Sequence, residues 1–198
     1  MIPIKRFLDI MLSILLLVLL APIFLMISIV LKITSSTPVF YPWDVIGKDG
    51  IPFRGYKFRT MLIDAEEIKE VLHDSNEMIG PVFKIKNDPR ITKVGKYLRK
   101  YSLDELPQLW SVLKGDMSLV GPRPAGTHEW IHYEEWQKRK LSVIPGMTCL
   151  WQVSGRNNIS NFNEWVKLDL EYVDNWTLWL DIIILIKTIP VVLKGTGQ

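Results

Sequence analysis

Residues 10–31 read IMLSILLLVLLAPIFLMISIVL, an apolar run of 22 residues without a charge. As a helix rising 1.5 Å per residue it would be about 33 Å long, enough to cross the hydrocarbon core of a bilayer. The run is too long for a signal peptide, and no small-x-small cleavage pattern follows it. The sequence therefore predicts a membrane-embedded helix over residues 1–33.

Pro22 lies inside this run, where proline removes one backbone hydrogen bond and bends a helix. Basic residues stand at both ends, Lys5 and Arg6 before the run and Lys32 after it, so the positive-inside rule selects no orientation. A helix that bends at Pro22 and returns to the same face would keep both basic ends in the cytosol. The residues by themselves leave this re-entrant form and a true span equally open.

The rest of the chain, residues 34–198, is long enough for one domain with its own core. A net charge of +3 suits anionic lipid or phosphorylated ligands. The basic residues are interleaved with acids rather than clustered, which argues against nucleic acid as a partner. Cys149 is the one cysteine in the sequence and cannot form an internal disulfide, so a reducing cytosol is expected.

Local patterns predict a mostly α-helical domain with a small β element (α+β). Short strands are expected between residues 37 and 60, around a turn at 47–50, and again from residue 151 to 156. Helices are expected at 61–73 and 95–101, and twice between 163 and 198, with a break near Asp174. The last helix is strongly apolar but interrupted by Asp181 and Lys187. It suits a helix lying in the headgroup layer or an ordinary buried core helix.

Two adjacent carboxylates, Asp104 and Glu105, lie in YSLDELPQLW (101–110), just before GDMSLVGPRP (115–124). Adjacent acids near a helix start are commonly capping residues. Ser102 and Glu105 match a capping box, but Pro107 favours Asp104 as the N-cap, because proline is tolerated in the first turn. A carboxylate held ionised there could act as a nucleophile.

Cations surround this pair in the sequence. Lys57 and Arg59 alternate with aromatic residues in a predicted strand, where the plain interpretation is a solvated strand edge. Arg123 lies between two prolines, whose stiff backbone can present a bidentate guanidinium to a phosphate. Carboxylates, cations and an apolar segment together indicate phosphate chemistry at a lipid surface.

A competing pattern is His128-Glu129-Trp130-Ile131-His132, an H-E-x-x-H sequence of the kind that binds zinc in proteases. The pattern is short and frequent by chance, and a third ligand would have to be an acid such as Glu164. The alternative is a surface helix start with Trp130 packed inward. A zinc-dependent membrane-bound hydrolase is nevertheless kept as one rival function, and a non-enzymatic membrane scaffold as another.

Several segments together resemble the bacterial sugar transferase family, the small monotopic phosphoglycosyl transferases that act on polyprenyl phosphate. The matching segments, in order, are KRFLD (5–9), Pro22, YKFRTM (56–61), DAE (64–66), KNDPR (86–90), SLDELPQL (102–109), LKGDMSLVGPRP (113–124), PGMT (145–148), WQVSGRN (151–157) and DNWTLWLD (174–181). They cover nearly the whole chain and are together far more specific than the H-E-x-x-H match.

The resemblance implies a two-step transfer of a sugar 1-phosphate from a UDP-sugar to polyprenyl (undecaprenyl) phosphate, with release of UMP. Asp104 would attack the β-phosphorus and carry the phosphosugar, while Glu105 would bind Mg²⁺ or assist proton transfer. The residues implied to neutralise the phosphates are Lys57, Arg59, Arg99 and Arg123. Those implied, more weakly, for the uridine or sugar are Gln152, Arg156 and Asn157.

The resemblance also implies a re-entrant helix broken at Pro22 and a catalytic domain on the cytosolic face of the bacterial inner membrane. There the enzyme would initiate assembly of an exopolysaccharide, O-antigen or other glycoconjugate. The implied partners are a UDP-sugar, polyprenyl phosphate and membrane lipid, with homo-oligomers left open. The chain is expected to be the catalytic core alone, without the extra membrane helices of some larger relatives.

Overall fold

The computed structural model describes residues 2–155 and 159–197. Its long helices are α1 (Pro3–Thr34), α3 (Lys93–Lys100), α8 (Phe162–Asp174) and α9 (Leu178–Leu193). Shorter α-helices are α2 (Ala65–Val71), α4 (Leu109–Lys114), α5 (Thr127–Trp130), α6 (Glu135–Lys138) and α7 (Leu150–Val153). The 3₁₀ turns are η1 (Lys48–Gly50), η2 (His73–Ser75), η3 (Leu103–Gln108) and η4 (Arg139–Ser142). The strands are β1 (Phe40–Ile46), β2 (Pro52–Phe58), β3 (Ser118–Val120), β4 (Ala125–Gly126) and β5 (Gly146–Thr148).

Two small sheets lie within the helical frame, and 57% of the chain is helical, so the α+β prediction is confirmed. In the first sheet β1 pairs antiparallel with β2 and with β4. The β1–β2 hairpin turns at η1, where Asp49 and Gly50 both adopt positive φ. In the second sheet β3 pairs in parallel with β5, so the chain leading to Arg123 is held beside Gly146.

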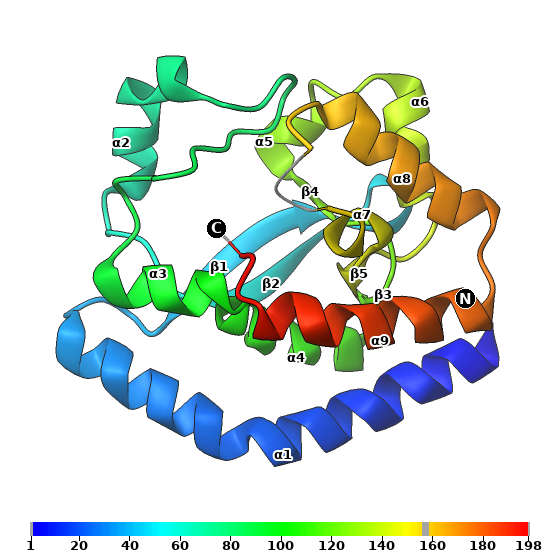
Figure 1. Cartoon of the computed structure of the whole chain (residues 1–198), viewed down its shortest axis with the longest axis horizontal. Coiled ribbons are helices and arrows are strands. Elements are labelled where there is room, and N and C mark those ends of the chain that lie inside the picture. The colour runs from blue at the N-terminus through cyan, green and yellow to red at the C-terminus, as the bar shows by residue number, and fades with distance from the viewer. Residues whose placement is uncertain (1, 156–158, 198) are drawn as a thin grey trace.

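Helix α1 lies along one side of the molecule and bends near its middle, so that both ends turn toward the remaining elements (Figure 1). Pro22 is inside the helix and accounts for a bend there, because it cannot donate a backbone hydrogen bond. The helix is long and apolar enough to cross a membrane, and little of its apolar window is buried in the protein. Its exposed surface is therefore an apolar face suited to lipid.

Two basic residues attach the first turns of α1 to the domain. Arg6 donates from its guanidinium to the backbone carbonyls of Val112 and Leu113, at 2.5 and 2.6 Å. Lys5 pairs with Asp181 of α9 at 2.6 Å. The sequence predicts a division of the chain after residue 33, and these bonds join the helix on one side of it to the domain on the other.

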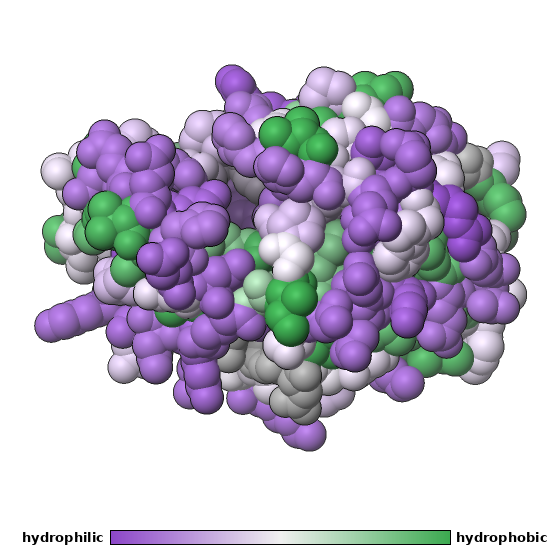
Figure 2. All heavy atoms as spheres, turned by 90° about the horizontal axis from the view of Figure 1, so that it is seen from above, coloured by the Kyte–Doolittle hydropathy of each residue, from purple (hydrophilic) through white to green (hydrophobic). Residues whose placement is uncertain are grey.

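Helix α9 has one side buried in the domain, as expected of a core helix, and one exposed apolar side, as expected of a helix in the headgroup layer. Asp181 and Ile184 are buried against the domain. The opposite side exposes large apolar side chains, among them Trp179, Ile186 and Leu193. In contrast, the face on the other side of the molecule from α1 is mainly hydrophilic (Figure 2).

Most predicted elements are present, with two corrections. The helices on either side of Asp174 are confirmed as α8 and α9, but the helix expected at 61–73 is shortened to α2 and η2. The strand expected from residue 151 is wrong, since these residues begin in helix α7. The helix starts there because the Gln152 side chain accepts a hydrogen bond from the backbone N–H of Cys149 at 3.1 Å, which caps the first turn.

Candidate active site

Asp104 and Glu105 lie at the start of η3, where both side chains are more than nine-tenths buried. The segment begins at Ser102, whose φ of 54° is left-handed and turns the chain sharply after α3. The N-cap is therefore Ser102 and not Asp104, contrary to the sequence prediction, and no side-chain cap bond forms. Pro107 is accommodated because this segment is a 3₁₀ turn that precedes α4 and not the first turn of an α-helix.

Glu105 is held by two of the predicted cations. Its Oε1 lies 3.2 Å from Nζ of Lys57 and 3.3 Å from a guanidinium nitrogen of Arg123. Lys57 comes from β2, and Arg123 follows β3, so the two small sheets meet at this carboxylate. The Lys57 ammonium also lies 3.9 Å from the centroid of the Trp43 ring, a cation–π contact that fixes its position further.

Arg99, from the last turn of α3, lies close to the same carboxylates. Its Nε donates to Oγ1 of Thr60 at 2.9 Å, which orients the guanidinium. Burial lowers the pKa of Arg99, an effect opposed by the negative charge of Asp104. Arg59 lines the cavity that contains these carboxylates. Its Nε donates to the backbone carbonyl of Pro38, so Arg59 lies at the rim of that cavity.

Charge and burial oppose each other at the other two cations. Burial lowers the pKa of Lys57, and the carboxylate of Glu105 only partly offsets this. For Arg123 burial acts in the same direction, but neighbouring negative charges, Glu105 foremost, outweigh it and raise the pKa. An anionic ligand between these side chains would favour their charged forms.

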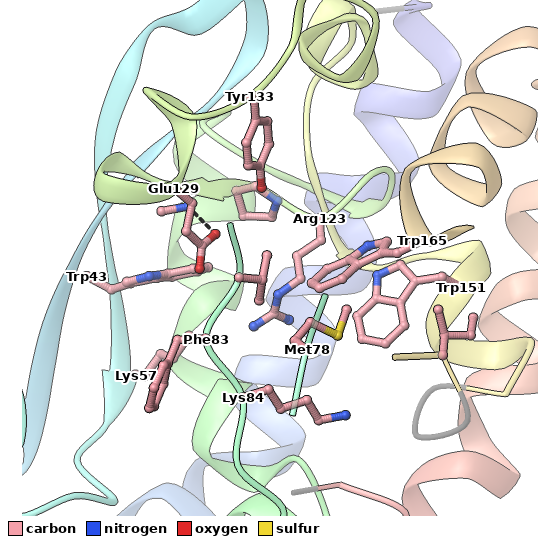
Figure 3. Close-up of a pocket in the computed structure, with 14 residues that line it drawn as sticks. Trp43, Lys57, Met78, Phe83, Lys84, Arg123, Glu129, Tyr133, Trp151 and Trp165 are labelled. Carbon is pink, nitrogen blue, oxygen red and sulfur yellow. Dashed lines mark hydrogen bonds between the residues drawn. The ribbon is translucent and has the colours of Figure 1, made fainter. Parts of the chain in front are cut away.

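The carboxylate pair and its cations line a polar cavity of about 370 Å³, which we call the phosphate cavity. A second cavity of about 250 Å³, the aromatic chamber, shares Trp43, Lys57, Arg123 and Glu129 with it (Figure 3). Trp151 and Trp165 line the chamber farther from Lys57. The two cavities together form one cationic space with an aromatic extension.

An apolar groove of about 340 Å³ approaches Glu105 as well. It is lined by leucine, isoleucine and valine side chains of α1, η3, α7 and α9, including Leu16, Leu20, Leu106, Leu185 and Val192. Glu105 lines both this groove and the phosphate cavity. Glu105 therefore lies where a polar cavity and an apolar groove meet, and Asp104 lines the polar cavity beside it.

The structure brings together Asp104, Glu105, Lys57, Arg99 and Arg123, with Arg59 at the rim. Gln152 is not in the polar space: it lines the apolar groove and its side chain caps α7. Arg156 and Asn157 lie outside the described residues.

Sequence reasoning missed the roles of Trp43 and Thr60. Thr60 lies next to Arg59 in the segment YKFRTM (56–61), which could have indicated it. No sequence pattern around Trp43 indicates a role in the site.

The H-E-x-x-H pattern does not form a zinc site in the described residues. Helix α5 ends at Trp130, so His132 is not on the helix that carries His128, and both imidazoles are exposed. Within residues 2–155 and 159–197, no three His, Cys, Asp or Glu residues are grouped to hold a metal.

Fold and site together define a protein with a long apolar helix suited to a membrane and a buried carboxylate pair set among cations. The bacterial sugar transferase model matches residues 2–195, and the chain belongs to that family.

Curated relatives carry related names. The chain is 48% identical, over 98% of its length, to the undecaprenyl-phosphate galactose phosphotransferase of Salmonella typhimurium. It is 54% identical, over 81% of its length, to the galactosyl transferase CpsE of Streptococcus agalactiae. It is 42% identical, over 98% of its length, to the exopolysaccharide production protein ExoY of Rhizobium meliloti.

The lengths of these relatives differ. The chain covers 36% of the CpsE protein and 41% of the Salmonella protein, but 87% of ExoY. The shared region is thus most of one relative and about two fifths of the others.

Proposed function

We propose that this protein transfers a sugar 1-phosphate from a UDP-sugar to polyprenyl phosphate and releases UMP. The observation that carries the proposal is the position of Glu105, where the phosphate cavity and the apolar groove meet, with Asp104 beside it in the phosphate cavity. A charged donor and a lipid-linked acceptor need those two environments on either side of the reacting group. The names of the Salmonella and Rhizobium relatives support the same reaction and its place in polysaccharide synthesis.

In the first step, a carboxylate oxygen of Asp104 attacks the β-phosphorus of the donor. The new bond joins that oxygen to phosphorus, the bond from the β-phosphorus to the bridging oxygen breaks, and UMP leaves with the electron pair. Lys57, Arg99 and Arg123 bind the diphosphate and offset the charge that builds on its oxygens. Burial of Asp104 keeps water away from the resulting acyl phosphate.

In the second step, a phosphate oxygen of polyprenyl phosphate attacks the phosphorus of the acyl phosphate. The bond between Asp104 and phosphorus breaks, which restores the carboxylate and gives a polyprenyl-diphosphate sugar. The apolar groove between α1 and α9 receives the first isoprene units, so the acceptor phosphate is delivered at Glu105. The exposed apolar sides of both helices support a groove that opens beside the lipid in which the acceptor would be dissolved.

Mg²⁺ is part of this proposal. Mg²⁺ binds through one or two carboxylates together with substrate phosphates and water, and a buried Glu105 beside the phosphate cavity fits that donor set. When bound, the ion would supply positive charge to the diphosphate oxygens. The location proposed is the cytosolic face of the bacterial inner membrane, where the re-entrant form of α1 would anchor the domain.

UMP release tests the proposal. The full chain in nanodiscs is given a panel of UDP-sugars, polyprenyl phosphate and Mg²⁺, and wild type is compared with Asp104→Asn and with Asp49→Asn, an exposed control. We expect UMP from at least one donor, lost in Asp104→Asn and retained in Asp49→Asn. The absence of UMP from every donor, with a folded wild-type protein, would overturn the proposed reaction.

A further inference from the structure

Glu129 is a carboxylate that the reaction described above does not use, although it lines both the phosphate cavity and the aromatic chamber. It lies on α5, which follows Arg123 by a few residues. Its Oε2 accepts a hydrogen bond from the backbone N–H of Gly126 at 3.2 Å, which folds the side chain back over the start of the helix. The carboxylate is thereby held in place rather than free in solvent.

The surroundings of Glu129 are those of a ligand site. Figure 3 shows its carboxylate, the Arg123 guanidinium and the Trp43 ring around one space. Tyr133, which is 5% exposed, lines the aromatic chamber beside Glu129. Burial, and next the negative charge of Glu129, raises the pKa of the Tyr133 hydroxyl, which therefore stays protonated and can donate.

A carboxylate beside a phosphate-binding arginine narrows the chemistry of the ligand. Its negative charge disfavours a phosphate next to it, so the part of the donor that lies here must be uncharged. That part must also donate hydrogen bonds, because an ionised carboxylate only accepts them. A UDP-sugar carries such uncharged donors as adjacent hydroxyl pairs, on its sugar and on its ribose.

The aromatic chamber suits a hydroxylated ring. Trp43 borders the space at the Lys57 end, while Trp151 and Trp165 line it farther away with ring centroids 4.2 Å apart. Aromatic faces pack against the C–H groups of a sugar ring, while a few placed polar groups read its hydroxyls. The aromatic chamber has a volume of about 250 Å³, and its lining includes the cations that would hold the diphosphate.

We propose that Glu129 accepts hydrogen bonds from an adjacent pair of hydroxyls on the UDP-sugar donor. This assignment rests on the proposed function and adds to it a residue that recognises the substrate. Two parts of the donor, the transferred sugar and the ribose, share this hydroxyl chemistry. Measurements of UMP binding separate them, because UMP carries the ribose but not the sugar.

The test compares wild type, Glu129→Gln and Glu129→Ala, with Glu135→Gln as an exposed control on the neighbouring helix. Glu129→Gln keeps an oxygen that can accept from Gly126, so the start of α5 is preserved while the charge is lost. The measurements are kcat/KM for UDP-galactose and UDP-glucose, which differ at one hydroxyl, the Kd of UMP, and the melting temperature.

If Glu129 binds the transferred sugar, Glu129→Gln lowers kcat/KM for the preferred donor by about tenfold, since a hydrogen bond to a charged group is replaced by a neutral one. UMP binding then stays as in wild type, and the ratio between the two sugars changes if the bound pair includes the 4-hydroxyl, at which they differ. If Glu129 binds the ribose, kcat/KM falls equally for both sugars and the Kd of UMP rises by the same factor.

Variants that match wild type in kcat/KM and in UMP binding, to within about twofold, would overturn the assignment. The assignment would also be overturned if Glu129→Ala lost activity together with a fall in melting temperature while Glu129→Gln kept its activity. In both cases wild type still releases UMP, which keeps this failure distinct from failure of the proposed reaction.

Discussion

Oδ1 of Asp9, in the first turns of α1, accepts a hydrogen bond from the backbone N–H of Leu119 at 3.0 Å. Leu119 lies in β3, four residues before Arg123, so helix α1 is bonded to the strand that leads to a site arginine. Asp9 is 3% exposed, which gives this bond little competition from water. The anchoring of the helix and the position of Arg123 are therefore coupled through one carboxylate.

Removal of this carboxylate should weaken both stability and activity. Asp9→Ala leaves the buried N–H of Leu119 without its acceptor, which we expect to cost about 1–3 kcal/mol in the free energy of unfolding. Asp9→Asn keeps an acceptor oxygen and should lose clearly less. Thermal unfolding in nanodiscs and steady-state UMP release measure the two effects, and equal behaviour of the two variants would contradict the role assigned to this hydrogen bond.

Lys57 should set the alkaline limit of activity. Burial lowers its pKa, and phosphate binding needs the protonated ammonium, so kcat/KM for the donor should fall as pH rises through this lowered value. The fall should begin below the ordinary range of a lysine. Lys57→Arg should move the alkaline limb to higher pH, because a guanidinium stays protonated.

The pH profile of kcat/KM for both proteins, in the same nanodiscs, checks this expectation. Asp44 and Arg54 form an exposed ion pair on the same hairpin, so Arg54→Lys serves as a control whose profile should follow wild type. An alkaline limb that does not move in Lys57→Arg would assign the titration to another group.

The sequence predicts which charged residues come together better than it predicts the local backbone. Asp104 and Glu105 are adjacent acids and Arg123 lies between two prolines, while Arg99 was named through the family resemblance, and the structure brings all of them together. The 3₁₀ turn that begins at Ser102 could not be recognised from the sequence. The left-handed backbone conformation of Ser102 depends on how α3 meets η3 and not on the residues alone. Gln152 was assigned to the ligand, whereas its side chain caps α7.

Other contributions come from residues distant in the sequence. Trp43 reaches the site because β1 pairs with β2, which sets Trp43 opposite Gly55 and near Lys57. Asp9 bonds to Leu119, 110 residues farther along the chain, and Asp181 pairs with Lys5, 176 residues before it. Such pairs depend on tertiary packing, for which a single sequence carries no periodic signal.

The apolar groove gives a prediction on the acceptor side. Leu20 lines the groove, whereas its neighbour Leu19 is exposed on the outer side of α1. Leu20→Trp should fill part of the groove and raise KM for polyprenyl phosphate, with the single-turnover release of UMP unchanged because donor attack precedes acceptor binding. Leu19→Trp should behave as wild type in both assays. A slower UMP burst in Leu20→Trp would place the groove on the donor side instead.

The bend of α1 predicts its topology. If the helix re-enters the same leaflet, cysteines introduced by Ile4→Cys and Ile33→Cys should both react with a membrane-impermeant maleimide added to one side. Val18→Cys, near the bend, should be protected by lipid. The natural Cys149 should not react with the maleimide, because it is 1% exposed and burial raises the pKa of its thiol. Labelling of the two ends from opposite sides would show a spanning helix.

Lys140 and Asp169 form a buried ion pair in the core behind Arg123. Nζ of Lys140 lies 2.6 Å from Oδ2 of Asp169, and the two side chains are 1% and 0% exposed. Lys140→Met leaves the carboxylate buried without its counter-charge, and we expect a loss of about 3–5 kcal/mol in the free energy of unfolding. Lys138→Met, in an exposed pair with Glu135, should change stability little.

Acid should restore part of this loss. Burial raises the folded-state pKa of Asp169, and removal of Lys140 takes away the positive charge that lowers it. A carboxyl whose folded pKa exceeds its unfolded value favours folding at pH below the unfolded value, and this contribution disappears as pH rises through the folded value. The melting temperature of Lys140→Met should therefore approach that of wild type as pH falls toward 3.8, the ordinary value for aspartate. A deficit that stays constant with pH would mean that lost packing of the lysine stem, and not the unpaired charge, is the cause.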